Sequence, residues 1–188
     1  MKPFKSILAL CLVLTINNLF AQLCSDSNRF VNSEYFSNKQ IDSLKNVTYG
    51  TAVNYLGEEQ VLKMDFYFPK DDVDSLAKRP FILLIHGGGF MGGQKENFII
   101  HCNELAKRGF VTATMSYRLG LNPDVPGDQA KAVYRAQQDA HTALNYVAEQ
   151  AENLGIDTSW VFIGGSSAGA ITSLYTRYGN QEEWNGVL

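Results

Sequence analysis

Three short runs rich in apolar and β-branched residues, each followed by a segment of helical character, constrain the fold most. The runs are Phe81–Ile85, Phe110–Ser116 and Trp160–Gly164. Runs of this length are typical of strands that are buried on both faces of a parallel sheet. Parallel strands need a crossover connection, which is usually a helix. The sequence therefore predicts a three-layer α/β fold with a mainly parallel sheet.

The segments after these runs have the spacing and end signals of helices. Gln94–Arg108 precedes Gly109, a residue that commonly ends a helix. A second helix of about 25 residues, ended by Gly155, places apolar side chains three and four positions apart. Ala168–Tyr178 predicts a third helix, and residues 186–188 resemble the first residues of a further strand. We therefore expect the later, C-terminal strands of the sheet to be missing from this chain.

The sheet is expected to begin with an antiparallel hairpin. Val47–Tyr55 and Gln60–Phe68 are rich in β-branched and aromatic residues, and a short turn containing Gly57 separates them. Residues 22–46 are polar and weakly periodic, which predicts a lead-in segment with one short helix near Asn38–Lys45. These boundaries leave residues 47–188 for one partial domain.

The first 21 residues have the pattern of a secretory signal peptide. Two lysines precede an apolar run over residues 7–16, and Ala21 is a small residue suited to cleavage. The run is about half as long as the ~20 apolar residues that a membrane span needs. We expect an exported protein, periplasmic or extracellular, with no stable span once the signal is removed. Acylation of Cys24 is the alternative, but Leu23 stands where processing requires a small residue.

Charge and cysteine content narrow the expected partners. The chain has 16 basic and 19 acidic residues, for a net charge of −3, and no block of like charge. Nucleic-acid binding needs a clustered basic surface, so we expect no nucleic-acid partner. Cys24 and Cys102 follow the signal and could form a disulfide outside the cytoplasm. Two unpaired cysteines are the simpler expectation.

A glycine-rich loop, His86-Gly87-Gly88-Gly89-Phe90-Met91-Gly92-Gly93, follows the first buried strand. Its spacing satisfies the dinucleotide fingerprint G-x-G-x-x-G, but that site needs an acidic residue about 20 positions on. The sequence has Met115-Ser116-Tyr117-Arg118 there. The second interpretation is that successive glycines let backbone N–H groups approach a developing oxyanion. A glycine turn without chemistry is the third, and the serine motif at residues 165–169 favours the second.

The segment Gly165-Ser166-Ser167-Ala168-Gly169 matches G-x-S-x-G between a predicted strand and a predicted helix. This strand-to-helix setting is the one in which the motif presents a nucleophilic serine. We therefore predict that Ser167 is a nucleophile and that the N–H of Ala168, at the helix N-terminus, helps to hold an oxyanion. A phosphate-binding P-loop is excluded because Ala170-Ile171 stands where Lys and Ser or Thr are required.

Three segments taken together, His86–Phe90, Ser116-Tyr117-Arg118-Leu119 and Gly164–Gly169, resemble the secreted bacterial carboxylesterases and lipases of the α/β-hydrolase superfamily. Acetyl-xylan and feruloyl esterases are among them, and the resemblance covers residues 47–188. It implies Ser167 as nucleophile and an oxyanion hole made by the N–H groups of Gly88, Gly89 and Ala168. The implied substrate is a small-molecule or polysaccharide-linked carboxylic ester, cleaved through an acyl-enzyme without metal or organic cofactor.

The chain departs from this family in its catalytic triad, whose acid and histidine follow the serine. After Ser167 the sequence holds two glutamates but no histidine. We expect His86 to orient the glycine loop, and His101 and His141 to be ordinary helix residues. The sequence is therefore expected to stop before the remaining triad residues, and the chain is expected to be insoluble or inactive.

Other interpretations stay open at this point. A peptidase or lipase on the same fold fits the motifs, because specificity lies in the loops. A non-catalytic binding protein or inactive fragment would keep the fold without the histidine. Within the fold, Arg118 and Asp139 either pair and brace the loop at residues 119–127 or remain two solvated charges.

Overall fold

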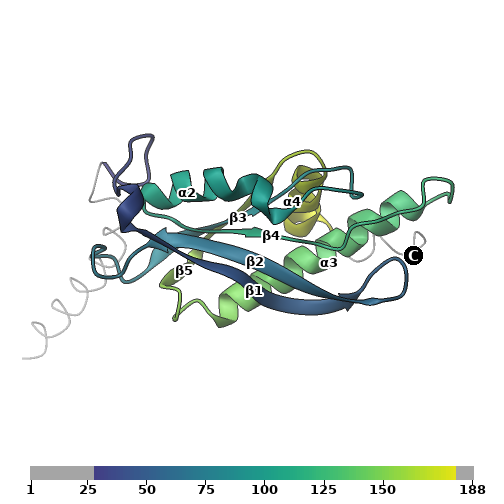
Figure 1. Cartoon of the computed structure of the whole chain (residues 1–188), viewed down its shortest axis with the longest axis horizontal. Coiled ribbons are helices and arrows are strands. Elements are labelled where there is room, and N and C mark those ends of the chain that lie inside the picture. Colours follow the sequence, from purple (N-terminus) through teal and green to yellow (C-terminus); the bar gives the residue numbers. More distant parts are fainter. Residues whose placement is uncertain (1–27, 181–188) are drawn as a thin grey trace, which may run out of the picture.

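The computed structural model describes residues 28–180, whose strands form one five-stranded mixed sheet (Figure 1). The spatial order is β1-β2-β4-β3-β5. β3 pairs in parallel with β4 and β5, whereas β2 pairs antiparallel with β1 and β4. The predicted order of a hairpin followed by parallel strands is therefore confirmed. The strand bounds are Ile41–Val53 for β1, Glu59–Pro69 for β2, Arg79–Ile85 for β3, Val111–Met115 for β4 and Ile156–Gly165 for β5.

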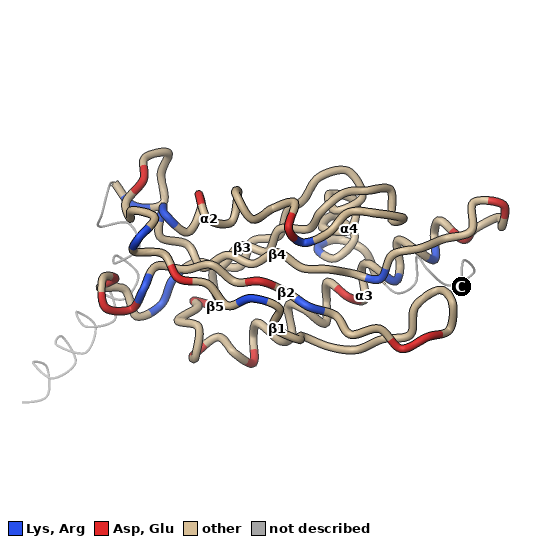
Figure 2. The backbone as a smooth tube through the Cα atoms, in the orientation of Figure 1, with Lys and Arg blue, Asp and Glu red and all other residues tan. Residues whose placement is uncertain are grey.

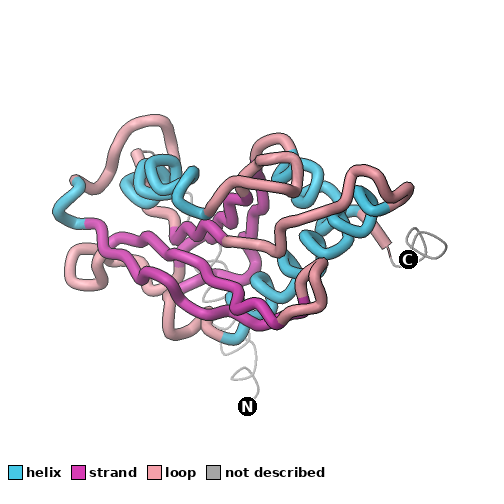
Figure 3. Tube along the Cα trace, turned by 45° about the vertical axis from the view of Figure 1, so that its right-hand side comes forward, coloured by secondary structure: helices cyan, strands magenta, loops and turns pink. Residues whose placement is uncertain are grey.

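Helices cover both faces of the sheet, as Figure 3 shows. Successive residues of a strand point to opposite faces, and on β3 Leu84 packs with Cys102 of α2 (Ile99–Lys107). The neighbouring Leu83 lies in the cluster formed with α3 (Asp128–Glu149) and the start of α4 (Ala168–Tyr178). The sheet is thus the middle of three layers, as the sequence predicts.

A stripe of alanines lets α3 approach the sheet closely. Four alanines at helical spacing on this helix are fully buried, and they face strand residues of which Phe66, Phe81 and Met115 are also fully buried. Small side chains on the helix thus leave room for large ones on the strands, as close packing of a core requires. The helical alanines are Ala132, Ala136, Ala140 and Ala143.

The segment before the hairpin differs from the expected short helix over Asn38–Lys45. Only Asn38–Gln40 is helical, as one turn of 3-10 helix (η2), and β1 begins directly after it at Ile41. β1 pairs on one side only, so polar residues along its free edge are tolerated and hide the strand pattern. A bulge in β1 contains Asn46, whose φ of 56° also interrupts the alternation.

The predicted helix over Gln94–Arg108 is divided into two pieces. A turn of 3-10 helix, η3 (Lys95–Phe98), precedes α2. Lys95 is buried, its Nζ lies 3.0 Å from Oδ2 of Asp65 on β2, and its carbonyl accepts a hydrogen bond of 2.9 Å from Thr114 of β4. Polar contacts to two strands therefore hold η3 in place, which an apolar spacing pattern does not reveal.

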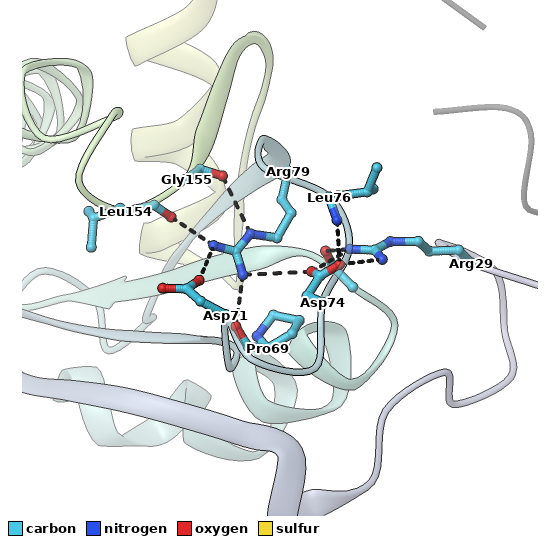
Figure 4. Close-up of polar contacts among 9 residues, drawn as sticks. Arg29, Pro69, Asp71, Asp74, Leu76, Arg79, Leu154 and Gly155 are labelled. Atoms are coloured by element: carbon cyan, nitrogen blue, oxygen red, sulfur yellow. Dashed lines mark hydrogen bonds and ion pairs between the residues drawn. The ribbon is translucent and has the colours of Figure 1, made fainter. Parts of the chain in front are cut away.

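A charged cluster ties the residues before β1 to the start of β3 (Figure 4). Both terminal nitrogens of Arg29 donate to the carboxylate of Asp74, each at 2.7 Å. Nη1 of Arg79, the first residue of β3, lies 3.6 Å from Asp74 and donates to the Pro69 carbonyl at 2.7 Å. The cluster lies at the opposite end of β3 from the glycine loop, so it fixes the strand rather than the loop.

Arg118 and Asp139 form a buried pair, which confirms that they pair rather than remain two solvated charges, but none of the hydrogen bonds of their side chains within residues 28–180 reaches the loop at residues 119–127. Nε of Arg118 donates to Oδ1 of Asp139 at 2.8 Å, and its backbone N–H donates to Oδ2 at 2.7 Å. Nη1 of Arg118 also donates to the Val53 carbonyl at the end of β1. The loop at residues 119–127 is contacted by Arg135, which donates to the Gly120 carbonyl at 2.7 Å.

Figure 2 shows charges of both signs along β1, β2 and α3. Cys102 on α2 is a buried free cysteine. None of the helices within residues 28–180 combines the length and apolar character that a bilayer crossing requires. The expected signal peptide, Cys24 and the expected strand at residues 186–188 lie outside the described residues.

Candidate active site

Two neighbouring strands bring the two predicted motifs together. β3 and β5 are parallel and adjacent, and Ile85 at the end of β3 is the register partner of Gly165 at the end of β5. The glycine loop follows Ile85 and the serine motif follows Gly165. The N–H of Ser166 donates to the Ile85 carbonyl at 3.3 Å. Both motifs therefore meet at the carboxyl edge of the sheet, where ligands of open α/β sheets bind.

Ser167 occupies a sharp turn between β5 and α4. Its φ of 49° and ψ of −117° place a non-glycine residue in backbone space that costs about 1–3 kcal/mol. The glycines on either side, Gly165 and Gly169, lie so close to the Ile85 carbonyl that a side chain on either would clash with it. The turn is thus pressed against the end of β3 while Ser167 itself stays exposed.

The glycine loop curls so that several of its N–H groups stay free. The Gly88 carbonyl accepts hydrogen bonds from Met91 at 3.1 Å and Gly92 at 3.0 Å, and Gly88 has a φ of 122°. Within residues 28–180 the N–H groups of Gly88, Gly89 and Ala168 donate to no other group. They are the donors that the sequence predicts for an oxyanion hole.

A cleft lies between the two motifs. It has a volume of about 380 Å³ and is lined by Gly87, Gly88, Gly93, Asn97, Ser166 and Ser167. A side chain at Gly87 would have its Cβ 2.8 Å from the Ser166 carbonyl oxygen and 3.1 Å from the Ser167 Cβ. Glycine at this position therefore lets the loop backbone pass directly beside the serine.

His86 is held beneath the glycine loop. Its ring is 1% exposed, stacks on Tyr117 with 4.4 Å between ring centroids, and places Nδ1 2.8 Å from the Gly87 carbonyl oxygen. Burial lowers the pKa of His86, so the neutral ring donates from Nδ1. The Tyr117 hydroxyl in turn donates to the His86 carbonyl at 3.0 Å. These contacts fit the predicted role of His86 in orienting the loop.

The other two histidines lie on exposed helix surfaces, His101 on α2 and His141 on α3. The His101 ring packs against Phe98 at 5.1 Å between centroids. Within residues 28–180 the hydroxyl of Ser167 has no hydrogen-bond partner. The described residues therefore supply a hydroxyl and N–H donors, and none of their histidines is hydrogen-bonded to Ser167.

Two residues of the site, Tyr117 and Asn97, are not among the site residues predicted from the sequence. Tyr117 belongs to a motif quoted for the family resemblance, and its position directly after β4 was a signal that an aromatic ring would reach the loop. Asn97 lies in no motif and reaches the cleft only because η3 is fixed to the sheet. Its carboxamide Oδ1 accepts a hydrogen bond of 2.8 Å from the Gln94 N–H.

A serine in a strand-to-helix turn beside a glycine loop, on a three-layer sheet, defines an α/β-hydrolase fold. The BD-FAE family profile matches residues 64–186, and the chain belongs to that family.

Curated relatives include esterases. Gut esterase 1 of Caenorhabditis elegans is 31% identical over 139 residues, which are 66% of this chain and 23% of that protein. Ethyl acetate hydrolase of Pseudomonas putida is 33% identical over 121 residues, 64% of this chain and 35% of that protein. Neuroligin-like protein glit-1 of Caenorhabditis elegans is 28% identical over 116 residues, 62% of this chain and 16% of that protein.

Solved structures agree with the fold. A bacterial heroin esterase superposes with a TM-score of 0.55 and 28% identity, over 90% of this chain and 46% of that one. Esterase 2 of Thermogutta terrifontis, phosphonylated by cyclosarin, gives a TM-score of 0.55 and 27% identity, over 70% of this chain and 45% of that one. The chain thus spans less than half the length of these structures and of the curated relatives described here.

Proposed function

We propose that this protein is a serine hydrolase of carboxylic esters with Ser167 as its nucleophile. One observation carries the proposal: the strained turn at Ser167 lies beside a loop whose Gly88 and Gly89 N–H groups are free, as is that of Ala168. Membership of the BD-FAE family and similarity to several esterases support the same activity.

In the proposed reaction, the Ser167 hydroxyl oxygen attacks the ester carbonyl carbon and its proton passes to a general base. The carbonyl oxygen gains negative charge, which the three free N–H groups stabilise in a site where they need no reorganisation. The alcohol then leaves with a proton, and water cleaves the resulting acyl-enzyme. Within residues 28–180 no group that could act as the base is hydrogen-bonded to Ser167.

The proposed substrates are small-molecule esters or esters linked to a polysaccharide. The names of ethyl acetate hydrolase and the bacterial heroin esterase favour esters of small acids. A cleft of about 380 Å³ is large enough for a short acyl group and the adjoining part of the alcohol. Peptidase or lipase activity on the same fold is distinguished by a panel of amide and long-chain substrates.

We also propose that residues 1–21 direct export to the periplasm or the medium. The two lysines, the apolar run and Ala21 carry this proposal. Mass spectrometry of the protein recovered outside the cytoplasm should find Gln22 as the first residue. A protein that stays in the cytoplasm with Met1 in place would contradict it.

Labelling with a fluorophosphonate probe tests the proposed nucleophile. The probe should modify Ser167 in the full-length protein, and Ser167→Ala should remove the label. Ser166→Ala is the matched control, because Ser166 lines the same cleft and its loss should leave labelling in place. No label on Ser167, or a label that survives Ser167→Ala, would overturn the proposal.

A further inference from the structure

Three of the residues that line the cleft beside Ser167 have polar side chains. Three of its six lining residues are glycines, and the other three are Ser166, Ser167 and Asn97. The proposed reaction uses Ser167 and the backbone N–H groups, but it assigns nothing to Asn97. Asn97 comes from η3, whereas the two serines follow β5. A ligand in the cleft therefore meets the two serines and Asn97 from different elements.

The orientation of the Asn97 carboxamide is determined by its neighbour. The backbone N–H of Gln94 can only donate, and it lies 2.8 Å from the Asn97 side chain, so the atom that it meets is Oδ1. The Nδ2 group must then occupy the other side of the amide. Within residues 28–180 this NH₂ group donates to no other residue. Asn97 is an exposed residue at the cleft, so this NH₂ group, held in one orientation by the Gln94 N–H, is available to a ligand in exchange for water.

The turn that carries Asn97 is firmly attached to the sheet. Lys95, two residues earlier, is 4% exposed, and its Nζ pairs with the buried Asp65 carboxylate of β2. Thr114 of β4 donates to the Lys95 carbonyl. A donor held on such a support loses little conformational freedom when it binds, so its hydrogen bond contributes more to affinity.

We infer that Asn97 recognises substrate, by donating from Nδ2 to an oxygen of the ester that lies close to the scissile group. The preferred substrates then carry an ether, hydroxyl or carbonyl oxygen either in the acyl part or in the alcohol part. The inference rests on the proposed function in one respect, because it takes the cleft over Ser167 as the ester-binding site. It makes Asn97 a specificity residue rather than a member of the reacting group.

Binding of matched amides, which are not hydrolysed on the timescale of a titration, tests this inference without turnover. For the acyl part the pair is 2-methoxy-N-methylacetamide and N-methylbutanamide, which differ only in the replacement of a methylene by an ether oxygen. For the alcohol part the pair is N-(2-methoxyethyl)acetamide and N-butylacetamide. Each is titrated into the ¹⁵N-labelled full chain, and the Kd is taken from the shifts of the Asn97 side-chain NH₂ and Gly88 amide signals.

The ether member of one pair should bind about three- to tenfold more tightly than its methylene partner, the range expected for one neutral hydrogen bond. Asn97→Asp removes the donor but keeps an oxygen for the Gln94 N–H, so it should abolish the preference without unfolding η3. Asn97→Ala, which loses both atoms, should abolish it as well.

Equal affinities within both pairs, or a preference that Asn97→Asp leaves unchanged, would overturn the inference, as would the absence of binding by all four amides. The pair that shows the preference identifies the part of the ester that Asn97 contacts. Because these probes do not need a reactive serine, a chain that binds them selectively but fails to react with a fluorophosphonate would separate this inference from the proposed nucleophile.

Discussion

Phe90 has a strained backbone conformation that is stabilised by contacts with its neighbours. It is a non-glycine residue with a φ of 63°, and its side chain is 2% exposed. The ring packs edge-on against Tyr117, and the Phe90 carbonyl accepts a hydrogen bond of 2.8 Å from the Gly120 N–H. These contacts offset the conformational cost, so that the adjacent Gly88 and Gly89 N–H groups stay free. The contacts of Phe90 thus help to hold the loop in the conformation that leaves these N–H groups free to bind.

Gly88 is expected to be the least replaceable residue of this loop. Gly88→Ala adds a side chain at a φ of 122° and drives it into the Gly92 carbonyl, whereas Gly89→Ala, at a φ of 62°, meets nothing within 4 Å. The first variant should lower the free energy of unfolding by more than the second, whose cost is about 1–2 kcal/mol from the backbone alone. Urea denaturation of both variants measures the difference, and equal losses would show that the clash is relieved by movement of the loop.

His86 should make stability depend on pH. Burial lowers its pKa in the folded state, while the unfolded chain keeps a value of about 6.5. As the pH falls through that value, the unfolded state binds the proton before the folded state does. Neutral His86 therefore contributes fully to the free energy of unfolding above about pH 6.5, and this contribution is lost on acidification. His86→Asn keeps a donor for the Gly87 carbonyl and should flatten the fall in unfolding free energy between about pH 7.5 and pH 5. His141→Gln, a change at an exposed site, should leave this fall in the unfolding free energy in place.

At the scale of elements, the apolar pattern predicts the strands of the sheet well, because a strand that is buried on both faces must consist mainly of apolar residues. β3 and β4 lie within two residues of their predicted bounds, and the serine turn lies where the G-x-S-x-G motif places it. β1, η3 and the start of β5 are the exceptions. β1 is an outer strand with a bulge, η3 is held by the Lys95–Asp65 pair, and β5 begins at Ile156, four residues before the predicted Trp160. Ion pairs between residues far apart in the sequence have no periodicity, which is also why Asn97 was not predicted.

The Arg118–Asp139 pair joins β4, α3 and the end of β1, and its two members should be energetically coupled. Burial raises the pKa of Asp139, and the guanidinium and N–H of Arg118 oppose that shift. Arg118→Gln and Asp139→Asn should each lower the unfolding free energy by about 3–5 kcal/mol, because each leaves a partner buried without its counter-charge. The double variant should lose less than the sum, with a coupling of about 0.5–3 kcal/mol. Additive losses in urea denaturation would contradict the coupling.

At the scale of the whole molecule, one group of exposed apolar side chains lies along β5 and α4. β5 is the edge of the described sheet, and Trp160 and Phe162 are 49% and 45% exposed there. Leu174 and Tyr178 of α4 are also exposed next to this strand. An unpaired apolar edge strand is a template for pairing with another chain. This face of the described residues is therefore expected to favour association.

The full chain is expected to self-associate through this face. Trp160→Lys together with Phe162→Lys should shift sedimentation toward monomer, because the charges oppose strand pairing at the edge. Leu56→Lys, which replaces a 63% exposed residue at the hairpin tip, is the control and should leave association unchanged. A chain that sediments as a monomer before any substitution would show that the edge is not used.

Ile85 at the end of β3 pairs with Gly165 at the end of β5, so the two motifs can meet only after the ribosome has synthesised β5. The ribosome releases the glycine loop long before β5, so a nascent chain holds the donors without the nucleophile. Closing the long segment between the two strands is a slow, non-local step. Ser167 can then react with a fluorophosphonate no earlier than the docking of β5 in register. In a cell-free translation, the onset of that reactivity would set the latest time for this docking.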